Sequence, residues 1–303
     1  MWNPVFNEYF ADPFVWAVGK EYFAVGTGRD EIFPILHSRD LLHWKCLGDA
    51  MERLDPTLGD TYWAPEVAFR DGHYWMYYSV GFSDKNHHIR TAVSRDPQGP
   101  YRDRGTLVAP NDPPFAIDPH PFQDIDGRWF LFYARDFLDT DGGTRVGTAL
   151  VADDLIRPDR VAGRPKVILR ARHNWQRFQS RRRMYGDDYD WHTLEGPCVR
   201  RHRGRYYCFY SGGRWEDASY GVDYAVAKSV MGPYSDAGSE SGPRVLRTTS
   251  GERLGPGHNS IFRGPHRRTY IAFHAWDPAQ TGRRLFIERL HWTPKGPRAE
   301  SMC

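Results

Sequence analysis

The chain has 303 residues, of which 40% are hydrophobic, 26% charged and 15% aromatic, and its formal net charge is only +3. This composition is ordinary for a soluble globular protein, and the scattered basic residues do not indicate nucleic-acid binding. No apolar run approaches the ~18 residues that a membrane-spanning helix needs, so neither a membrane nor a nucleic acid is expected as a partner.

The N-terminal segment, MWNPVFNEYFADPF, lacks the basic stretch followed by an apolar stretch that marks a secretory signal peptide. The four cysteines do not have the spacing of a metal site; they are Cys46, Cys198, Cys208 and Cys303. We therefore expect a cytoplasmic protein whose cysteines stay reduced.

The predicted elements are short strands, because Gly, Pro and Asp interrupt the chain about every ten residues and few stretches have the apolar spacing of a helix. A turn followed by an aromatic strand recurs at residues 19–28, 71–81, 126–136, 203–213 and, more loosely, 266–276. Before each of these strands stands a leading element: ADPFV (11–15), WAPEVAF (63–69), AIDPHPF (116–122), LEGPCVR (194–200) and GHNSIF (257–262). A further strand follows most of them, at 35–44, 91–101, 148–158, 225–235 and 287–297.

This unit occurs in five copies about 50–75 residues apart, and such repetition is typical of the small sheets of a β-propeller. We therefore predict an all-β fold, a five-bladed β-propeller. A β-sandwich with coincidental hairpins is the alternative, and a solenoid fits less well because most strand-based solenoid repeats are shorter.

Each leading element carries a polar residue at nearly the same place: Asp12, Glu66, Asp118, Glu195 and His258. The first strand of a propeller blade lines the central axis, so these side chains are predicted to meet at one mouth of the channel. Two carboxylates that face one pocket can hydrolyse a glycosidic bond, one as acid and the other as base or nucleophile. A third acid nearby would raise the pKa of the proton donor by like-charge repulsion.

In these motifs the chain resembles glycoside hydrolase family 43, whose members are five-bladed propeller enzymes acting on arabinose- and xylose-containing glycans. The resemblance runs from Asn3 to about Gly296 and lies in ADPFV, WAPEV, AIDPHPFQDIDG, LEGPCVRRHRGRYY, GPGHNSIF, SRDLLHW and GPY. It implies a single catalytic domain over residues 1–303 with no appended module.

Residue by residue, the resemblance implies that Asp12 is the general base, Glu195 the general acid, and Asp118 the residue that tunes the pKa and orientation of the acid. Hydrolysis would then be a single displacement with inversion, with the two reacting carboxyl groups ~6.5–9.5 Å apart to leave room for a water molecule. This chemistry requires no cofactor.

Three further side chains take substrate-binding roles from the resemblance. Trp63 resembles a tryptophan that walls the subsite for the terminal sugar, and Phe33 holds a similar family position. Arg284 resembles a late arginine that contacts sugar hydroxyls, although Arg283 beside it could hold that place instead. Core packing for the aromatic residues and a surface charge for the arginine are the alternative roles.

His258 resembles an axial histidine that, in many members of the family, helps to hold a calcium ion through water. Calcium prefers oxygen ligands, so this ion would be structural rather than catalytic. The alternative is an uncharged histidine with hydrogen-bonded ring nitrogens. Glu66 also faces the predicted channel and is given no catalytic role, and the adjacent His87 and His88 do not suit two metal ligands on one strand face.

Residues 170–193 lengthen the link between the third and fourth repeats and are rich in basic and aromatic side chains. Loops longer than ~15 residues in compact domains are usually functional or disordered. We interpret this segment as a loop on the active face that shapes the pocket, with phosphate or RNA binding by SRRR (180–183) as the alternative.

The predicted function is that of an exo-acting α-L-arabinofuranosidase that releases terminal arabinose from short oligosaccharides. A β-D-xylosidase, or an enzyme with both activities, is the close alternative, and an endo-arabinanase is a more distant one. From a different class, a non-catalytic carbohydrate-binding propeller would have no need of all three acids. The sequence leaves the sugar, the linkage and the oligomeric state open.

Overall fold

The computed structural model describes residues 3–110, 112–250 and 253–300. Within these ranges strands dominate, and the helices are short 3-10 turns, namely η1 (Pro56–Leu58), η2 (Asp141–Gly143), η3 (Asn174–Gln176) and η4 (Pro265–Arg267). No helix in the described ranges is long and apolar enough to cross a membrane. The predicted all-β fold class is confirmed.

Most strands belong to small antiparallel sheets in which consecutive strands pair with one another. The first sheet contains β1 (Ala11–Val18), β2 (Glu21–Thr27), β3 (Pro34–Ser38) and β4 (Lys45–Asp49). The second contains β5 (Thr61–Arg70), β6 (His73–Phe82), β7 (Lys85–Ser94) and β8 (Arg102–Val108), and the last contains β18 (Leu254–Arg263), β19 (Thr269–Trp276), β20 (Arg283–Thr293) and β21 (Gly296–Glu300).

The remaining strands form two antiparallel groups that are joined into one larger sheet. One group is β9 (Ala116–Gln123), β10 (Trp129–Phe137), β11 (Gly147–Arg157), β12 (Arg160–Val161) and β13 (Lys166–Leu169). The other is β14 (Arg177–Met184), β15 (Asp187–His202), β16 (Arg205–Gly212) and β17 (Gly221–Ala227). A short parallel pairing of Gly147–Thr148 with His192–Thr193 connects them.

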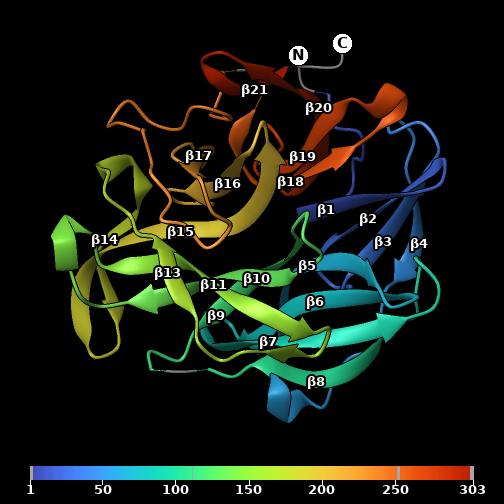
Figure 1. The fold of residues 1–303 in the computed structure, drawn as a ribbon, viewed down its shortest axis with the longest axis horizontal. Helices are drawn as coiled ribbons and strands as arrows, with labels where there is room; N and C mark the ends of the chain where they lie inside the picture. The colour runs from blue at the N-terminus through green and yellow to red at the C-terminus, as the bar shows by residue number, and fades with distance from the viewer. Residues whose placement is uncertain (1–2, 111, 251–252, 301–303) are drawn as a thin grey trace.

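The leading strand of each group lies on the inside of a closed ring, and these strands correspond to the leading elements of the sequence repeat. Around the ring β1 contacts β5, β5 contacts β9, β9 contacts β15, β15 contacts β18, and β18 contacts β1 again (Figure 1). Radial repetition of small sheets around an axis is the arrangement of a β-propeller. Apolar side chains pack between neighbouring sheets, as Phe132 of β10 and Tyr210 of β16 do within one buried cluster.

The ring is closed without a covalent link, by the N-terminal segment lying along the last sheet. The N–H of Val5 donates to the carbonyl of Leu285, and the N–H of Phe10 donates to the carbonyl of Arg283, both at 2.9 Å. Phe10 is completely buried in a cluster that includes Leu285 and Ile287 of β20. The first and last parts of the described chain therefore share one core.

A β-bulge interrupts each inner strand at the same place, where the ladder register shifts. The bulge residue has a left-handed conformation in every case, with φ values of 49°, 47°, 58°, 57° and 49° for Asp12, Ala64, Asp118, Gly196 and His258. Proline follows the bulge residue in the first four strands and Asn259 in the last. Proline fits there because a bulge leaves one residue out of the ladder, so that its missing N–H breaks no pairing.

The bulges correct the repeat alignment made from the sequence. Asp12, Asp118 and His258 occupy the bulge position itself, whereas Glu195 comes one residue before the bulge at Gly196. Glu66 comes two residues after the bulge of its own strand. A one-residue offset changes the direction of a side chain in a strand, so the aligned polar residues do not all point the same way.

Residues 170–193 are wrongly predicted as a loop for most of their length. Arg177–Met184 and the start of β15 form a β-hairpin, in which Met184 pairs with Asp187 across a turn at Tyr185 and Gly186 (Figure 1). Both turn residues have positive φ, as a two-residue hairpin turn requires. Because β14 is mostly exposed, its sequence lacks the apolar alternation by which a strand is recognised.

Candidate active site

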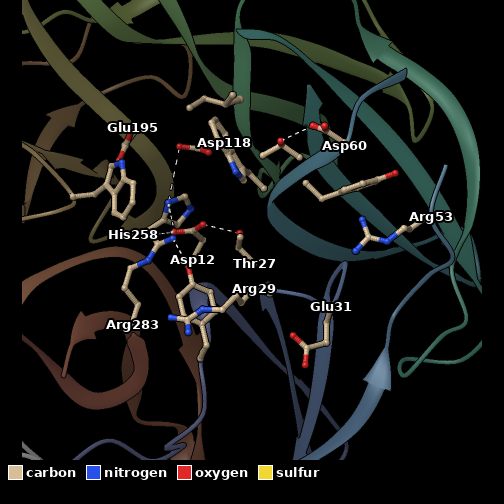
Figure 2. Close-up of a pocket in the computed structure, with 17 residues that line it drawn as sticks. Asp12, Thr27, Arg29, Glu31, Arg53, Asp60, Asp118, Glu195, His258 and Arg283 are labelled. Atoms are coloured by element: carbon tan, nitrogen blue, oxygen red, sulfur yellow. Dashed lines mark hydrogen bonds and ion pairs between the residues drawn. The ribbon is translucent and has the colours of Figure 1, made fainter. Parts of the chain in front are cut away.

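A pocket of about 430 Å³ opens where the bulges of the inner strands converge. The predicted residues Asp12, Trp63, Asp118, Glu195 and His258 all line it (Figure 2). The remaining lining residues come from the N-terminal segment and the loops around the mouth, and they include Tyr9, Thr27, Arg29, Glu31, Arg53, Asp60, Tyr62, Trp215 and Arg283. The structure thus brings together side chains from all the repeats.

Asp12 lies among hydrogen-bond donors and cations, as Figure 2 shows. Its Oδ2 accepts the hydroxyl of Thr27 at 2.6 Å, and its Oδ1 lies 3.4 Å from both Nδ1 of His258 and Nη1 of Arg283. Burial by itself would raise the pKa of this carboxyl, but His258 and Arg283 outweigh it and hold the pKa well below its ordinary value. Asp12 is therefore ionised throughout the physiological range.

His274 supports Asp12 from the neighbouring sheet. Its Nδ1 accepts the backbone N–H of Asp12 at 3.0 Å, so the ring proton of the neutral form belongs on Nε2. Burial, with the charge of Arg283 second, lowers the pKa of His274 to about 4. The ring is therefore neutral at pH 7 and fixes the backbone at the bulge of β1.

The surroundings of Glu195 raise its pKa, whereas those of Asp12 lower its pKa. It accepts a hydrogen bond at Oε1 from the hydroxyl of Tyr220 at 2.6 Å. Burial raises the pKa of Glu195 to about 7, even though the Tyr220 hydroxyl, Arg283 and Arg182 act in the other direction. A carboxyl group with this pKa carries a proton in a large fraction of molecules at neutral pH, as a proton donor must.

Asp118 is held directly against the strand that carries Glu195. Its Oδ2 accepts the N–H of Gly196 at 2.9 Å. In the other inner strands the bulge N–H is bonded by Thr27, Ser79, Ser211 or His274. On β10 the equivalent position is Ala134, whose side chain has no polar atom. The bulge N–H of β15, at Gly196, is therefore bonded by Asp118 of β9 instead.

The carboxyl groups of Asp118 and Glu195 titrate as a pair. Burial, followed by the charges of Glu195 and Asp12, raises the pKa of Asp118 well above its ordinary value. Two interacting acids cannot both ionise easily in a buried site, because the second negative charge is repelled by the first. At neutral pH the pair therefore retains a proton that can be given to a leaving group.

The arginine in the pocket is Arg283, not Arg284. Arg283 is 9% exposed, donates from Nη2 to the hydroxyl of Tyr9 at 2.6 Å, and lies with its guanidinium 4.5 Å from the ring of Trp215. Arg284 points to the other face of β20 and pairs with Asp277 at 2.7 Å. The reason is strand alternation, by which adjacent residues project to opposite faces.

The two aromatic candidates are placed differently. Trp63 lines the pocket, and its ring stacks on that of His87 at a centroid distance of 3.8 Å. Phe33 is fully buried and packs edge-on against Tyr62 and Tyr78, so no sugar can reach it. The substrate role expected for Phe33 is thereby corrected to a core role beneath the pocket wall.

His258 lies in the pocket, where its Nδ1 is 3.4 Å from Oδ1 of Asp12 and 4.0 Å from Oδ2 of Asp118. Burial lowers its pKa, with the charge of Asp12 opposing that effect. Among the described residues no group of three or more His, Cys, Asp or Glu side chains could hold a metal ion. A single imidazole suits calcium poorly, so calcium binding stays a prediction and no step below depends on it.

Several site residues have no counterpart among the sequence candidates, namely Tyr9, Thr27, Trp215, Tyr220 and His274. Thr27 and His274 end the aromatic strands of their repeats, at the position that Ser79 and Ser211 occupy in two others. A closer alignment of the repeats would have found them. Tyr9, Trp215 and Tyr220 lie in segments outside the repeat pattern and carry no such signal.

The chain is similar to known proteins over almost its whole length. The sequence model described as Glycosyl hydrolases family 43 matches residues 1–297. The beta-D-galactofuranosidase xynD of Aspergillus niger is 26% identical, with 97% of this chain and 83% of that protein covered. The extracellular exo-alpha-(1->5)-L-arabinofuranosidase ArbA of Cellvibrio japonicus is 25% identical, with 94% and 84% covered.

Solved structures show the same fold. A thermostable family-43 glycoside hydrolase superposes with a TM-score of 0.79 at 25% identity, covering 96% of this chain and 93% of the other. A protein from Bacteroides thetaiotaomicron, described as an endo-1,4-beta-xylanase, gives a TM-score of 0.78 at 24% identity, with 100% and 97% covered. At these identities the second likeness concerns the fold alone.

Proposed function

The chain belongs to glycoside hydrolase family 43 and is a glycosidase, and from this premise we propose that it is an inverting, exo-acting α-L-arabinofuranosidase. One observation carries the proposal: a single pocket holds Asp12, which is kept ionised, and Glu195, whose pKa is raised to about 7. Two carboxyl groups whose surroundings push their pKa values apart are suited to act as base and acid.

In the proposed reaction, Glu195 gives its proton to the glycosidic oxygen as the bond from that oxygen to the anomeric carbon breaks. Asp12 takes a proton from a water molecule on the opposite face of the sugar, and the oxygen of that water forms the new bond to the anomeric carbon. Glu195 ends as a carboxylate and Asp12 as a carboxylic acid, and exchange of protons with solvent restores both. The hydroxyl of Thr27 holds the Asp12 carboxylate in place.

Asp118 and Arg283 complete the proposed machinery. Asp118 orients the strand of Glu195 through the Gly196 N–H, and it interacts with Glu195 so that the two acids do not both lose their protons easily. Arg283 stabilises ionised Asp12 and presents its remaining donors to sugar hydroxyls. Trp63 supplies an apolar wall for the C–H face of the terminal sugar.

Arabinofuranose is the favoured substrate because the relatives that cover most of this chain include proteins named for furanoside cleavage. A relative named xylan 1,3-beta-xylosidase, from a Vibrio species, keeps β-D-xylosidase as the second candidate. An endo-arabinanase of Bacillus subtilis is 26% identical over 96% of this chain, so internal cleavage of arabinan is the third.

A panel of 4-nitrophenyl glycosides and arabino-oligosaccharides tests the proposal. We expect turnover of the α-L-arabinofuranoside, release of single arabinose units from the oligosaccharides, and a first product with inverted anomeric configuration in the proton NMR spectrum. Faster release of 4-nitrophenol from the β-D-xyloside or the β-D-galactofuranoside would show that the preferred sugar is xylose or galactofuranose and not arabinofuranose. Retention of configuration would overturn the mechanism, and sugar binding without any turnover would indicate a non-catalytic propeller.

The two proposed catalytic acids are tested in the same assay. We expect Asp12→Asn and Glu195→Gln to keep the fold, judged by circular dichroism and thermal unfolding, and to retain less than about one-tenth of wild-type kcat. A variant above that level would show that its residue does not have the assigned role.

A further inference from the structure

A buried hydrogen-bonded pair of side chains, Glu66 and His120, lies outside the pocket lining and has no part in the reaction as described so far. Nδ1 of His120, on β9, is 2.7 Å from Oε2 of Glu66 on β5. His120 is 1% exposed and Glu66 is 8% exposed, and neither lines the pocket. Polar side chains at such burial need a hydrogen-bond partner to compensate for the loss of water, and here the two partners come from different sheets.

The hydrogen bonds define the proton positions on His120. The N–H of Val199 donates to Nε2 of His120 at 3.0 Å, so Nε2 has no proton of its own in that contact. The proton of the neutral ring is therefore on Nδ1, where it is donated to the carboxylate of Glu66. Both ring nitrogens are satisfied, and the ring bridges β5, β9 and β15.

The bridge joins the same two strands that carry Asp118 and Glu195. Asp118 and His120 are two residues apart on β9, and their partners on β15 are the N–H groups of Gly196 and Val199. The inner strands β9 and β15 do not pair with each other, since β9 pairs with β10 and β15 pairs with β16. These two side-chain bonds are thus cross-links that set how closely β9 and β15 approach beside the pocket.

We propose that the Glu66–His120 pair is a positioning device for the catalytic acids. By bonding Val199, His120 holds β15 against β9 at a second point, and Glu66 fixes the orientation of the imidazole from β5. In this way the pair keeps Glu195 in position relative to Asp118 without touching the substrate. This inference rests on the proposed function, in which these two carboxyl groups cooperate, and it gives Glu66 a role at a distance from the reacting atoms.

The test compares His120→Ala with a matched control. Tyr206→Phe removes a different buried contact between the same two strand groups, the bond from the Tyr206 hydroxyl to Asp124 at 2.7 Å, which is remote from the pocket lining. We expect His120→Ala to lower kcat by about 10- to 100-fold with KM within about threefold, because small misplacements of catalytic groups cost rate rather than binding. Tyr206→Phe is expected to keep kcat within about threefold of wild type.

Two further variants separate positioning from general loss of stability. His120→Gln retains an acceptor for the Val199 N–H and donors for Glu66, and we expect it to restore at least part of the kcat lost in His120→Ala. Glu66→Ala is expected to lower kcat in the same direction, and the double variant Glu66→Ala, His120→Ala should lose little more than either alone, as residues that act as a unit do. If His120→Ala does not fold, the comparison of His120→Gln with Tyr206→Phe decides the question.

Amide hydrogen exchange gives a readout that does not depend on the substrate. We expect His120→Ala to speed exchange at both Val199 and Gly196, and Tyr206→Phe to leave both unchanged. If the wild-type protein cleaves no glycoside, the proposed function fails while exchange at Gly196 still tests the cross-link. The inference is overturned if exchange at Gly196 stays slow in His120→Ala, or if Tyr206→Phe loses as much kcat as His120→Ala does.

Discussion

At the scale of single residues, Asp12 and Glu195 show how one pocket can separate two identical functional groups. Asp12 is buried and Glu195 is partly buried, and loss of contact with water by itself raises a carboxyl pKa. Asp12 is compensated by His258 and Arg283, whereas Glu195 has the Tyr220 hydroxyl and only more distant cations. The difference in compensation decides which group is ionised and which retains its proton.

This contrast predicts the pH dependence of activity. Glu195 must be protonated, so kcat/KM should fall as the pH rises through about 7, the raised pKa of this group. The Tyr220 hydroxyl stabilises the carboxylate form and lowers the pKa, so Tyr220→Phe should raise the pKa further and move the alkaline limb to higher pH. The control is Tyr210→Phe. It removes the hydrogen bond from the hydroxyl of this buried tyrosine on β16 to Asp236.

A pH–rate profile of each variant checks this expectation. An alkaline limb that stays in place or moves to lower pH in Tyr220→Phe would show that Glu195 is not the group titrating there.

The arginine assignment gives a second prediction at this scale. Arg283→Ala removes a cation beside Asp12 and a donor in the pocket, so we expect kcat/KM to fall by about 100-fold or more, the cost typical of losing one preorganised charge in an active site. Arg284→Ala is the matched control, since this neighbour pairs with Asp277 on the other face of the strand. Equal losses in the two variants, measured by steady-state kinetics, would contradict the assignment.

At the scale of the elements, the bulge of each inner strand is the device that turns side chains into the pocket. A left-handed backbone costs energy for most residues and persists only where surrounding contacts hold it. Here the bulge N–H is bonded across to an adjacent strand in each described case. Four prolines after the bulge residues could be recognised in the sequence, but the cross-strand partners could not.

Gly196 allows the contribution of the bulge to be measured. Its φ is +57°, and a Cβ there would meet the ring of His258 at 3.3 Å. Gly204 in the following turn has a φ of +76° with nothing within 4 Å of a Cβ. We expect Gly196→Ala and Gly204→Ala each to lose roughly 1 kcal/mol of unfolding free energy from the left-handed backbone, the former somewhat more.

Only Gly196→Ala should lose activity, by about tenfold or more, because its methyl group displaces His258 and loosens the bond to Asp118. Denaturant unfolding and kcat measurements on both variants check this. Unchanged kcat in Gly196→Ala would mean that the bulge of β15 does not position the acid.

At the scale of the whole molecule, the ring depends on contact between the first and last parts of the chain. The N-terminal segment pairs with β20, and the pocket residues Tyr9 and Arg283 are bonded across the same junction. Closing the ring therefore positions part of the pocket. We expect a change at this junction to affect both stability and activity.

Phe10→Ala tests the closure. Phe10 is 0% exposed in the junction core, so its truncation should lower the free energy of unfolding by about 3–5 kcal/mol. Phe69→Ala, at a position that is 59% exposed on β5, should change it by less than about 0.5 kcal/mol. Chemical denaturation followed by tryptophan fluorescence measures both, and a small effect for Phe10→Ala would show that the junction contributes little.

Features that depend on neighbouring residues along the chain can be predicted without the structure. The repeat of short strands, the acids that head them and the prolines beside the bulges are local patterns, so the all-β fold and the acids of the pocket could be predicted. The alternation of side chains along a strand is also a local pattern. It does not distinguish Arg283 from Arg284, because which of the two points into the pocket depends on the register of β20 in the last sheet.

Which side chains meet depends on how distant parts of the chain fold together. Phe33 is buried because two sheets close over it, Tyr220 reaches Glu195 from a loop, and His120 joins three strands that are far apart in sequence. The pKa values of Asp12 and Glu195 follow from these contacts. Burial and charge are set by closure of the ring, and no residue carries that information in its immediate sequence neighbours.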